Sequence, residues 1–306
     1  MLTESGMKIL VTGVNGQLGH DAVSELIRRG HTVVGSGSSE TSFCPAEYCC
    51  LDIRDEAAVI SAISDLKPDA VIHCAAWTAV DAAESSENID KVYAVNSKGT
   101  ENIARACKLI DCKMLYISTD YVFNGEGTSP WSPDCKDYAP LNVYGKSKLE
   151  GELAVSGLLE KYFIVRTSWV FGLNGGNFVR TMLKLAKKHD VLRVVNDQIG
   201  APTYTIDLAR LLADMIESDK YGCYNATNEG GYVSWYDFST AILSTAGYNA
   251  ALIPVTTDEY GFCTAKRPLN SRLDTAKLSS AGFKLLPPWQ DALKRYLAEL
   301  KNAQII

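Results

Sequence analysis

The sequence has no apolar run that approaches the roughly 18 residues of a membrane-spanning helix, although 46% of its 306 residues are hydrophobic. It also has no basic tail or stripe, and its net charge of -6 argues against a nucleic acid polymer as partner. Residues 1–6 lack the basic start and the apolar stretch of a secretory signal, and we expect an irregular extension there. These absences predict a soluble, cytoplasmic protein that binds neither membranes nor nucleic acid polymers.

Cysteine pairs with metal-ligand spacing are also missing. Nine cysteines are scattered without a repeated C-x-x-C pair, and Cys49 and Cys50 are adjacent in an apolar run. This pattern argues against a zinc site and is typical of reduced thiols in a cytosol. The four histidines fall in no nucleophile or metal pattern, so the sequence assigns no metal.

Short β-branched runs alternate with longer amphipathic segments through the first half of the chain, which is typical of βαβ units. We therefore predict an α/β fold with a Rossmann-type doubly wound parallel sheet. The expected strands cover residues 8–12, 32–34, 48–51, 70–74, 113–118 and 163–167. The expected helices cover residues 17–29, 56–66, 88–110 and 146–156.

After Arg166 this rhythm breaks into shorter mixed segments separated by Gly, Asn and Pro clusters. We expect a dinucleotide-binding domain over residues 1–170, with an interleaved return near residues 201–227. A second, smaller α/β lobe that binds the substrate is expected over residues 171–200 and 228–306.

Three glycines with G-x-x-G-x-x-G spacing lie between the first expected strand and the first expected helix. Glycine permits a positive φ and lets backbone N–H groups approach a pyrophosphate, which the N-terminus of the helix then attracts. The strand-turn-helix context therefore predicts a dinucleotide site. Its predicted residues are Gly13, Gly16, Gln17, Leu18 and Gly19.

No carboxylate closes the second expected strand, which continues as Gly35-Ser36-Gly37-Ser38-Ser39. An acidic residue there would hydrogen-bond the 2′-hydroxyl of NAD and repel the 2′-phosphate of NADP. Small hydroxyl residues such as Ser36 leave room for the phosphate, although a basic partner is missing unless Arg28 or Arg29 folds over. NADPH is therefore the favoured cofactor, and use of NADH as well is left open.

Two later strand ends supply further candidates for cofactor binding. Asp52 and Ile53 close the third strand, where Asp52 is placed to meet the adenine edge. The alternative for Asp52 is an N-cap of the helical segment that starts at Asp55. The residues that follow the fourth strand are expected to line the ribose and the nicotinamide: Ala75, Ala76 and Trp77.

A Y-x-x-x-K pattern formed by Tyr144 and Lys148 opens the last expected helix of the first domain. Residues four apart project from one helical face, so the ammonium can lower a phenol pKa that is ordinarily ~10. The preceding strand ends in Ser118-Thr119-Asp120, at the carboxyl edge of the sheet where ligands bind. Together these residues predict a general acid, its electrostatic tuner and a hydroxyl that polarises a carbonyl group.

These motifs resemble the extended short-chain dehydrogenases and, within them, the dTDP-4-dehydrorhamnose reductase family. The similarity runs over nearly the whole chain, at residues 13–19, 75–84, 118–123, 140–152, 166–170, 196–203 and 267–273. The resemblance implies NADPH-dependent reduction of the C4 keto group of dTDP-4-dehydro-L-rhamnose, a step of dTDP-L-rhamnose biosynthesis. It implies that Tyr144 donates a proton, Thr119 orients the carbonyl, and Lys148 binds the nicotinamide ribose.

For the sugar nucleotide, the resemblance implies contact with Trp169, for which a role in the core is the alternative. Asp120 is expected beside the substrate as well. Asn177 and Arg267 are candidate donors to the pyrophosphate, with a surface salt bridge as the alternative for Arg267. Asn96 can support Lys148 through a water or serve as an ordinary polar helix residue.

Several alternatives stay open. Some family members bind Mg²⁺ through carboxylates at a dimer contact, but only Asp21 suggests itself here, so Mg²⁺ and a homodimer stay open. Another nucleotide-sugar reductase or an epimerase would share the fold, whereas Tyr121 after Asp120, in place of Glu, disfavours a dehydratase. A non-catalytic NADP-binding regulatory subunit is disfavoured by the intact set of Thr119, Tyr144 and Lys148.

Overall fold

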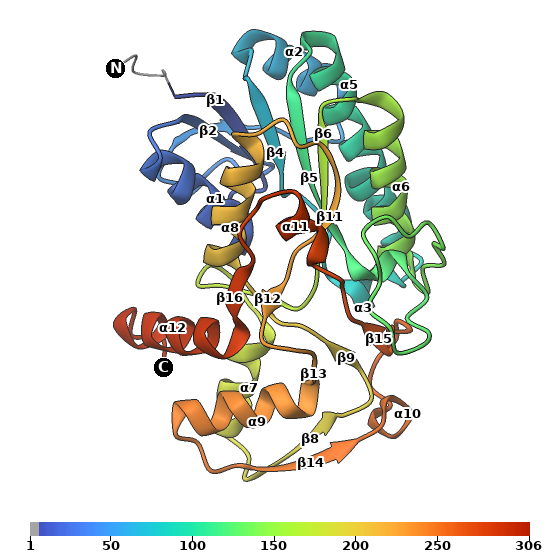
Figure 1. The fold of residues 1–306 in the computed structure, drawn as a ribbon, viewed down its shortest axis with the longest axis vertical. Helices are drawn as coiled ribbons and strands as arrows, with labels where there is room; N and C mark the ends of the chain where they lie inside the picture. Colours follow the sequence, from blue (N-terminus) through green and yellow to red (C-terminus); the bar gives the residue numbers. More distant parts are fainter. Residues whose placement is uncertain (1–5) are drawn as a thin grey trace.

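The computed structural model describes residues 6–306, so that all but Gly6 of the expected extension lies outside the described residues. At its centre lies a seven-stranded parallel sheet in the order β11-β6-β5-β4-β1-β2-β3 (Figure 1). This arrangement confirms the predicted doubly wound fold. The strands are β1 Lys8–Thr12, β2 Thr32–Gly37, β3 Glu47–Cys50, β4 Ala70–His73, β5 Lys113–Thr119, β6 Tyr162–Thr167 and β11 Gly222–Asn225.

Helices cover both faces of this sheet, so its strands are apolar on both sides (Figure 1). One face packs against α1 (Gln17–Arg28) and α8 (Thr205–Ile216). The opposite face packs against α2 (Glu56–Leu66), α5 (Thr100–Ile110) and α6 (Val143–Leu158). The two apolar layers hold the sheet rigid, and its carboxyl edge is left free for loops.

The single helix expected over residues 88–110 is wrong in one respect. The segment forms α4 (Ile89–Tyr93), a widened π-helical turn (Ala94–Gly99) and then α5. Asn96 lies buried in the π turn, where its side chain accepts a hydrogen bond from the Trp77 N–H and donates to the Trp77 carbonyl and the Ser147 hydroxyl. The wider turn thus directs the Asn96 amide toward the loop after β4. A pattern of apolar residues in the sequence does not show such a turn.

A third apolar core belongs to the second lobe, below the sheet in Figure 1. The helices of this lobe are α7 Phe178–Ala186, α9 Trp235–Ala246 and α12 Trp289–Asn302. Strands β8 (Val191–Val195) and β14 (Ala251–Val255) pair in parallel at its outer side. Between α7 and α9 the chain returns to the central sheet through α8 and β11, so the chain crosses between the two parts more than once.

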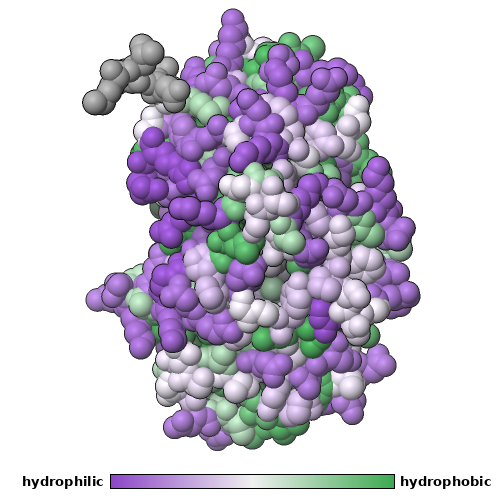
Figure 2. All heavy atoms as spheres, viewed as in Figure 1, coloured by the Kyte–Doolittle hydropathy of each residue, from purple (hydrophilic) through white to green (hydrophobic). Residues whose placement is uncertain are grey.

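The surface of the face shown in Figure 2 is mostly hydrophilic, and its hydrophobic residues lie in small groups among polar ones. Phe43 and Phe262 are the most exposed large apolar side chains of the described residues, and both lie in loops. Between residues 6 and 306, no helix combines the length and the apolar character needed to cross a bilayer.

A buried ion pair joins α6 to the central sheet. Arg166 of β6 is completely buried and donates from Nε and Nη2 to both carboxylate oxygens of Glu152, at 2.8 and 2.7 Å. Its Nη1 donates to the Pro133 carbonyl at 3.1 Å, and Nη2 also donates to the Tyr138 hydroxyl at 3.0 Å. The pair therefore fixes α6 against β6 and closes the loop around residues 133–138 over it.

Glu152→Gln keeps the shape of this side chain but leaves the Arg166 guanidinium without its counter-charge. We expect the free energy of unfolding to fall by roughly 3 kcal/mol or more, because breaking a buried ion pair strands a desolvated charge. Urea unfolding measures the change. The control is Glu101→Gln, whose surface pairs with Lys98 and Arg105 contribute about 0.3–0.5 kcal/mol each. Equal effects of the two variants would contradict the role given to the pair.

Candidate active site

A cleft of about 870 Å³ runs along the carboxyl edge of the sheet and is closed from the second lobe by Trp235 and residues 174–176. The strand order reverses between β1 and β4, which is where ligands bind in doubly wound sheets. All residues predicted to bind the cofactor line this cleft: Gly13, Gly16, Gln17, Leu18, Gly19, Ser36, Asp52, Ile53, Ala75, Ala76, Trp77, Tyr144 and Lys148.

The glycine turn between β1 and α1 brings the N-terminus of α1 to the cleft. Gly13 has φ +71°, and a Cβ on it would lie 2.6 Å from the backbone nitrogen of Ala75, so no other residue fits. Its N–H donates to the Ser36 carbonyl at 2.8 Å, which ties the turn to the end of β2. Gly16 precedes α1 and offers no side-chain cap, so the first N–H groups of the helix remain available to an anion.

Four buried polar atoms in the cleft lining have no hydrogen-bond partner within the described residues: Ser36 Oγ, Ser118 Oγ, Asp120 Oδ2 and Thr167 Oγ1. Buried polar groups without partners are rare in proteins, and several in one cleft indicate a polar ligand. The glycine turn and these atoms together fit a dinucleotide near α1 and a polar reactant near the ends of β5 and β6.

The structure brings Thr119 and Tyr144 together at the end of β5. Asn142 caps α6 by accepting a hydrogen bond from the Gly145 N–H at 2.8 Å, which fixes where the helix begins. A Cβ on Gly145 would lie 2.3 Å from the Tyr121 carbonyl oxygen, so glycine is required for the helix to start this close to the strand end. The Tyr144 phenol then lies within hydrogen-bond reach of the Thr119 hydroxyl and edge-on to the Tyr121 ring.

Lys148 lies buried one helical turn further along α6. Its Nζ donates to the Ile117 carbonyl at 2.7 Å and lies 4.1 Å from the centroid of the Tyr116 ring. Burial lowers the pKa of Lys148 to about 7, while the charge of Glu152 opposes this shift. The ammonium is therefore close to losing its proton at neutral pH.

Burial also raises the pKa of Tyr144 above its ordinary value, and the hydrogen bond with Thr119 only partly offsets this. The sequence predicted the reverse, a phenol pKa lowered by the Lys148 ammonium. In the structure burial dominates and Lys148 is not among the groups that lower this pKa, so Tyr144 keeps its proton at neutral pH. The arrangement favours Tyr144 as a proton donor over a proton acceptor.

Asp120 lies beside this group, buried, with Oδ1 accepting a hydrogen bond from the Thr119 hydroxyl at 3.0 Å. Burial raises the pKa of its carboxyl group to about 6, which nearby hydroxyl groups, among them that of Thr119, partly counter. Asp120 lines the cleft, as expected for a residue next to the reactant.

Trp169 follows β6 in a left-handed conformation with φ +49° and stacks on Trp235, with ring centroids 3.5 Å apart and planes inclined by 12°. Both rings line the cleft and both stay partly exposed. Trp235 is the first residue of α9, and sequence reasoning missed it. The Ser234 and Asp237 pair that caps α9 marks a helix start but carries no sign of a site.

Two predicted substrate donors lie outside the cleft lining. Asn177 caps α7 by accepting from the Arg180 N–H, and its amide donates to the Tyr296 hydroxyl and to two further acceptors. The structure therefore shows Asn177 in structural contacts, and its role toward the substrate stays a prediction. Arg267 pairs with Asp81 at 2.5 Å, which is the salt bridge left open for it.

The structure also shows what Asp52 and Asn96 contact, each of which had two interpretations. Asp52 is not the cap of α2, because Asp55 accepts the capping hydrogen bond from the Ala58 N–H. The Asp52 carboxylate instead binds the guanidinium of Arg54, a cleft residue that sequence reasoning missed. Asn96 binds the backbone of the Trp77 loop and so positions this cleft wall.

Among residues 6–306, no group of three or more His, Cys, Asp or Glu side chains is arranged to hold a metal ion. Asp21, the residue considered for Mg²⁺, pairs with His20 at 3.5 Å. This contact raises the pKa of His20.

Residues 7–302 match the family model described as the RmlD substrate binding domain. The chain belongs to this family. It is 41% identical to the dTDP-4-dehydrorhamnose reductase of Aggregatibacter actinomycetemcomitans, over 95% of this chain and 98% of that protein. It is 40% identical to the spore coat polysaccharide biosynthesis protein SpsK of Bacillus subtilis (strain 168), over 97% and 99%.

Among solved structures, the dTDP-4-dehydrorhamnose reductase of Bacillus anthracis str. Ames, in complex with NADP, superposes with a TM-score of 0.88. The two chains are 38% identical, over 96% of this chain and 99% of that one. The resemblance drawn from the seven motifs is thereby confirmed at the level of the family.

Lys148→Met is expected to flatten the pH dependence of stability. Folded Lys148 has a pKa of about 7, whereas an unfolded lysine keeps its proton up to about pH 10. The unfolded chain therefore binds more protons between these values, and the stability of the parent protein rises with pH across that window. Methionine carries no charge to desolvate, so the gain in Tm over the parent should be largest at pH 7 and below.

Thermal unfolding followed from about pH 6 to about pH 9 measures this effect, and the gain should shrink by several degrees over that range. The control is Lys146→Met, an exposed neighbour on the same helix, for which the difference in Tm should not depend on pH. A pH-independent difference for Lys148→Met would show that the buried ammonium is not destabilised.

Proposed function

We propose that this chain is a dTDP-4-dehydrorhamnose reductase that uses NADPH, with NADH as a weaker alternative, to reduce the C4 keto group of dTDP-4-dehydro-L-rhamnose to dTDP-L-rhamnose. The observation that carries the proposal is the position of Thr119, Tyr144 and Lys148 in the same cleft as the glycine turn. Several relatives of that name, 36–41% identical, and the NADP complex of the Bacillus anthracis reductase support it.

The residues of this chain suit the protonation half of a carbonyl reduction. A reduced nicotinamide supplies the hydride when bound. Tyr144 holds a proton at neutral pH, because burial raises its pKa, and can donate it to an oxygen that gains negative charge. Thr119 offers a hydroxyl that polarises the same carbonyl, and Lys148 provides a positive charge that stabilises the phenolate left behind.

Each part of the cofactor and of the substrate is assigned to a different stretch of the cleft. We assign the pyrophosphate to the N–H groups of the first turn of α1, which the glycine turn lets it approach closely, and the adenine to Asp52 and Ile53. Residues 75–77 and Lys148 are assigned to the nicotinamide and its ribose. The part of the chain before residue 170, with its return near 201–227, then holds the cofactor, and the second lobe holds the sugar nucleotide with Trp169.

Tyr144→Phe removes only the phenolic hydroxyl and tests the acid. We expect kcat to fall by at least ~100-fold, the lower range for loss of a general acid, with NADPH affinity and Tm almost unchanged. The measurement is the loss of reduced-nicotinamide absorbance on adding dTDP-4-dehydro-L-rhamnose, with identification of the sugar product.

The matched control is Tyr162→Phe, at the opposite, amino end of β6, which should leave kcat unchanged. If Tyr144→Phe turns over dTDP-4-dehydro-L-rhamnose at nearly the parent rate, the acid is assigned wrongly. A parent protein that binds NADP but turns over no such sugar would favour a regulatory subunit or an epimerase instead.

Trp169→Ala tests the substrate side of the cleft. Stacking of an aromatic side chain on a nucleobase is worth about 1–3 kcal/mol, so KM for the sugar nucleotide should rise roughly 10-fold while kcat changes little. Steady-state kinetics and thermal unfolding are measured together. A large drop in Tm with an unchanged KM would instead show that Trp169 and its stack with Trp235 serve the core.

A further inference from the structure

Positive charge is scarce in the cleft. Of the residues that line it within the described chain, only Lys148 and Arg54 carry a positive charge. Lys148 lies at the reactive end, buried against Ile117 and Tyr116. Arg54 follows β3, and it lies at the end of the cleft where β2 and β3 leave the sheet. One guanidinium is therefore available to a phosphate at that end.

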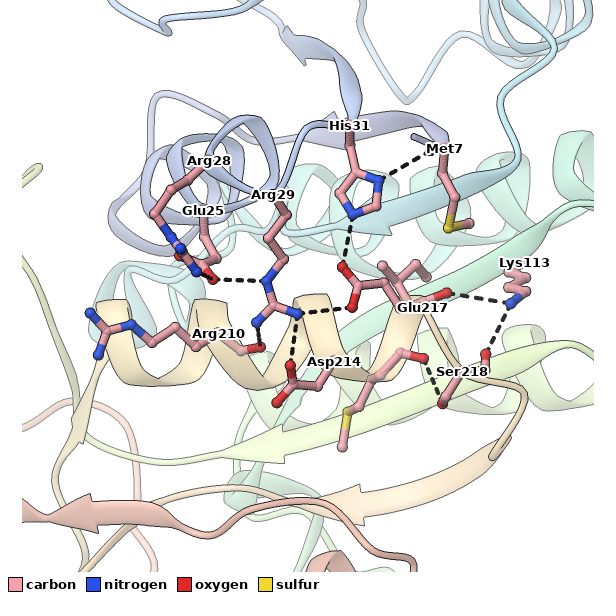
Figure 3. A network of polar contacts seen from close by, with 12 residues as sticks. Met7, Glu25, Arg28, Arg29, His31, Lys113, Arg210, Asp214, Glu217 and Ser218 are labelled. Atoms are coloured by element: carbon pink, nitrogen blue, oxygen red, sulfur yellow. Dashed lines mark hydrogen bonds and ion pairs between the residues drawn. The ribbon is translucent and has the colours of Figure 1, made fainter. Parts of the chain in front are cut away.

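The two arginines considered from the sequence serve another purpose. Arg29 pairs with Glu25, Asp214 and Glu217, and Arg28 pairs with Glu25. Figure 3 shows this network at the C-terminal end of α1, where it joins α1 to α8. Both arginines are thus paired at the end of α1 that faces away from the glycine turn, so neither supplies the basic partner that the sequence left open.

Arg54 is held beside the end of β2 by backbone pairing. Gly37 of β2 lies opposite Cys50 of β3, and the Leu51 N–H donates to the Gly37 carbonyl at 2.8 Å. The next residues of both strands therefore leave the sheet side by side. Ser38 and Ser39, which follow β2, and Arg54, which follows β3, all line the cleft.

Asp52 orients the Arg54 guanidinium but does not occupy all of its N–H donors. Its Nε and Nη2 donate to Asp52 Oδ1 and Oδ2 at 2.9 and 2.6 Å, and this pairing lowers the pKa of Asp52. The side chain is 49% exposed, and its Nη1 makes no hydrogen bond to the described part of the chain. On the β2 side the buried Ser36 hydroxyl also has no partner among the described residues.

We propose that Arg54 binds the 2′-phosphate of NADP and sets the preference for NADPH over NADH, with Asp52 as the residue that holds its guanidinium in place. The proposal rests on the cofactor assigned above. Arginine offers paired N–H donors that suit phosphate, and the serine hydroxyls after β2 add donors from the other side.

The Asp52 pairing explains how both nucleotides can be accepted. With its charge compensated by Arg54, the Asp52 carboxylate repels a nearby phosphate less than a free carboxylate would. NADH lacks the phosphate, but Arg54 then keeps its partner Asp52, and no charge is left unpaired. Arg54 therefore favours NADPH without excluding NADH.

The test is nucleotide binding, measured by calorimetry on the full chain without sugar substrate. Arg54→Gln should weaken binding of NADP⁺ by about 10- to 100-fold, as expected for the loss of hydrogen bonds to a charged group. Binding of NAD⁺ should change by less than about 2-fold. The fragment 2′,5′-ADP should weaken in parallel with NADP⁺, whereas 5′-AMP should not, which locates the effect at the 2′-phosphate.

Two further variants serve as controls. Arg105→Gln removes the same charge from an exposed ion pair on α5, outside the cleft lining, and should leave every affinity unchanged. Arg54→Lys should restore part of the NADP⁺ affinity, since it keeps the charge but not the paired donors. Unchanged NADP⁺ binding in Arg54→Gln, or an equal loss for NADP⁺ and NAD⁺, overturns the proposal. Failure of the parent chain to bind either nucleotide would overturn the proposed function as well.

Discussion

The buried ion pair between Arg166 and Glu152 is the interaction on which the reactive end of the cleft depends. Tyr144, Lys148 and Glu152 follow one another at intervals of four residues, so they share one face of α6. Clamping Glu152 to β6 therefore fixes the other two against the end of β5. An apolar pair could stabilise α6 equally well. A bidentate ion pair, however, also fixes the rotation of α6 about its axis and its position along β6.

The same close packing affects the charges of Tyr144 and Lys148 in ways that oppose each other in the reaction. Desolvation raises the pKa of Tyr144 and lowers that of Lys148 to about 7, so both groups are driven toward their neutral forms. A neutral phenol is the form that donates a proton, whereas a neutral amine cannot stabilise the phenolate that remains. Any anionic group bound beside Lys148 would favour its ammonium form again. Ligand binding would thus restore the charge that the chemistry needs, which couples occupancy of the cleft to its reactivity.

Sequence patterns predicted most of the central sheet, and every residue they predicted for the cofactor lines the cleft, because both depend on local rules, but they missed Arg54. The glycine turn, the strand ends and the Y-x-x-x-K helix each carry a short-range signal, and a doubly wound topology brings their carboxyl ends to one edge. The features that were missed depend on packing between distant segments. Trp235 reaches Trp169 only through the second lobe, and the Asn177 amide donates to the Tyr296 hydroxyl only because α12 packs beside the start of α7. The periodic pattern of apolar residues in the sequence does not predict such contacts.

Arg54 and Lys148 show how this cleft handles anions with little positive charge. The chain has a net charge of -6, so long-range attraction does not draw a nucleotide toward it. Each cationic group already has an acceptor within the protein, the Asp52 carboxylate for Arg54 and the Ile117 carbonyl for Lys148. Neither group is therefore left unpaired when a ligand is absent or lacks a phosphate. Recognition must then come from short-range geometry. The cleft offers unpaired backbone N–H groups at the start of α1 and one cationic side chain toward each of its ends. A ligand has to match the positions of all three.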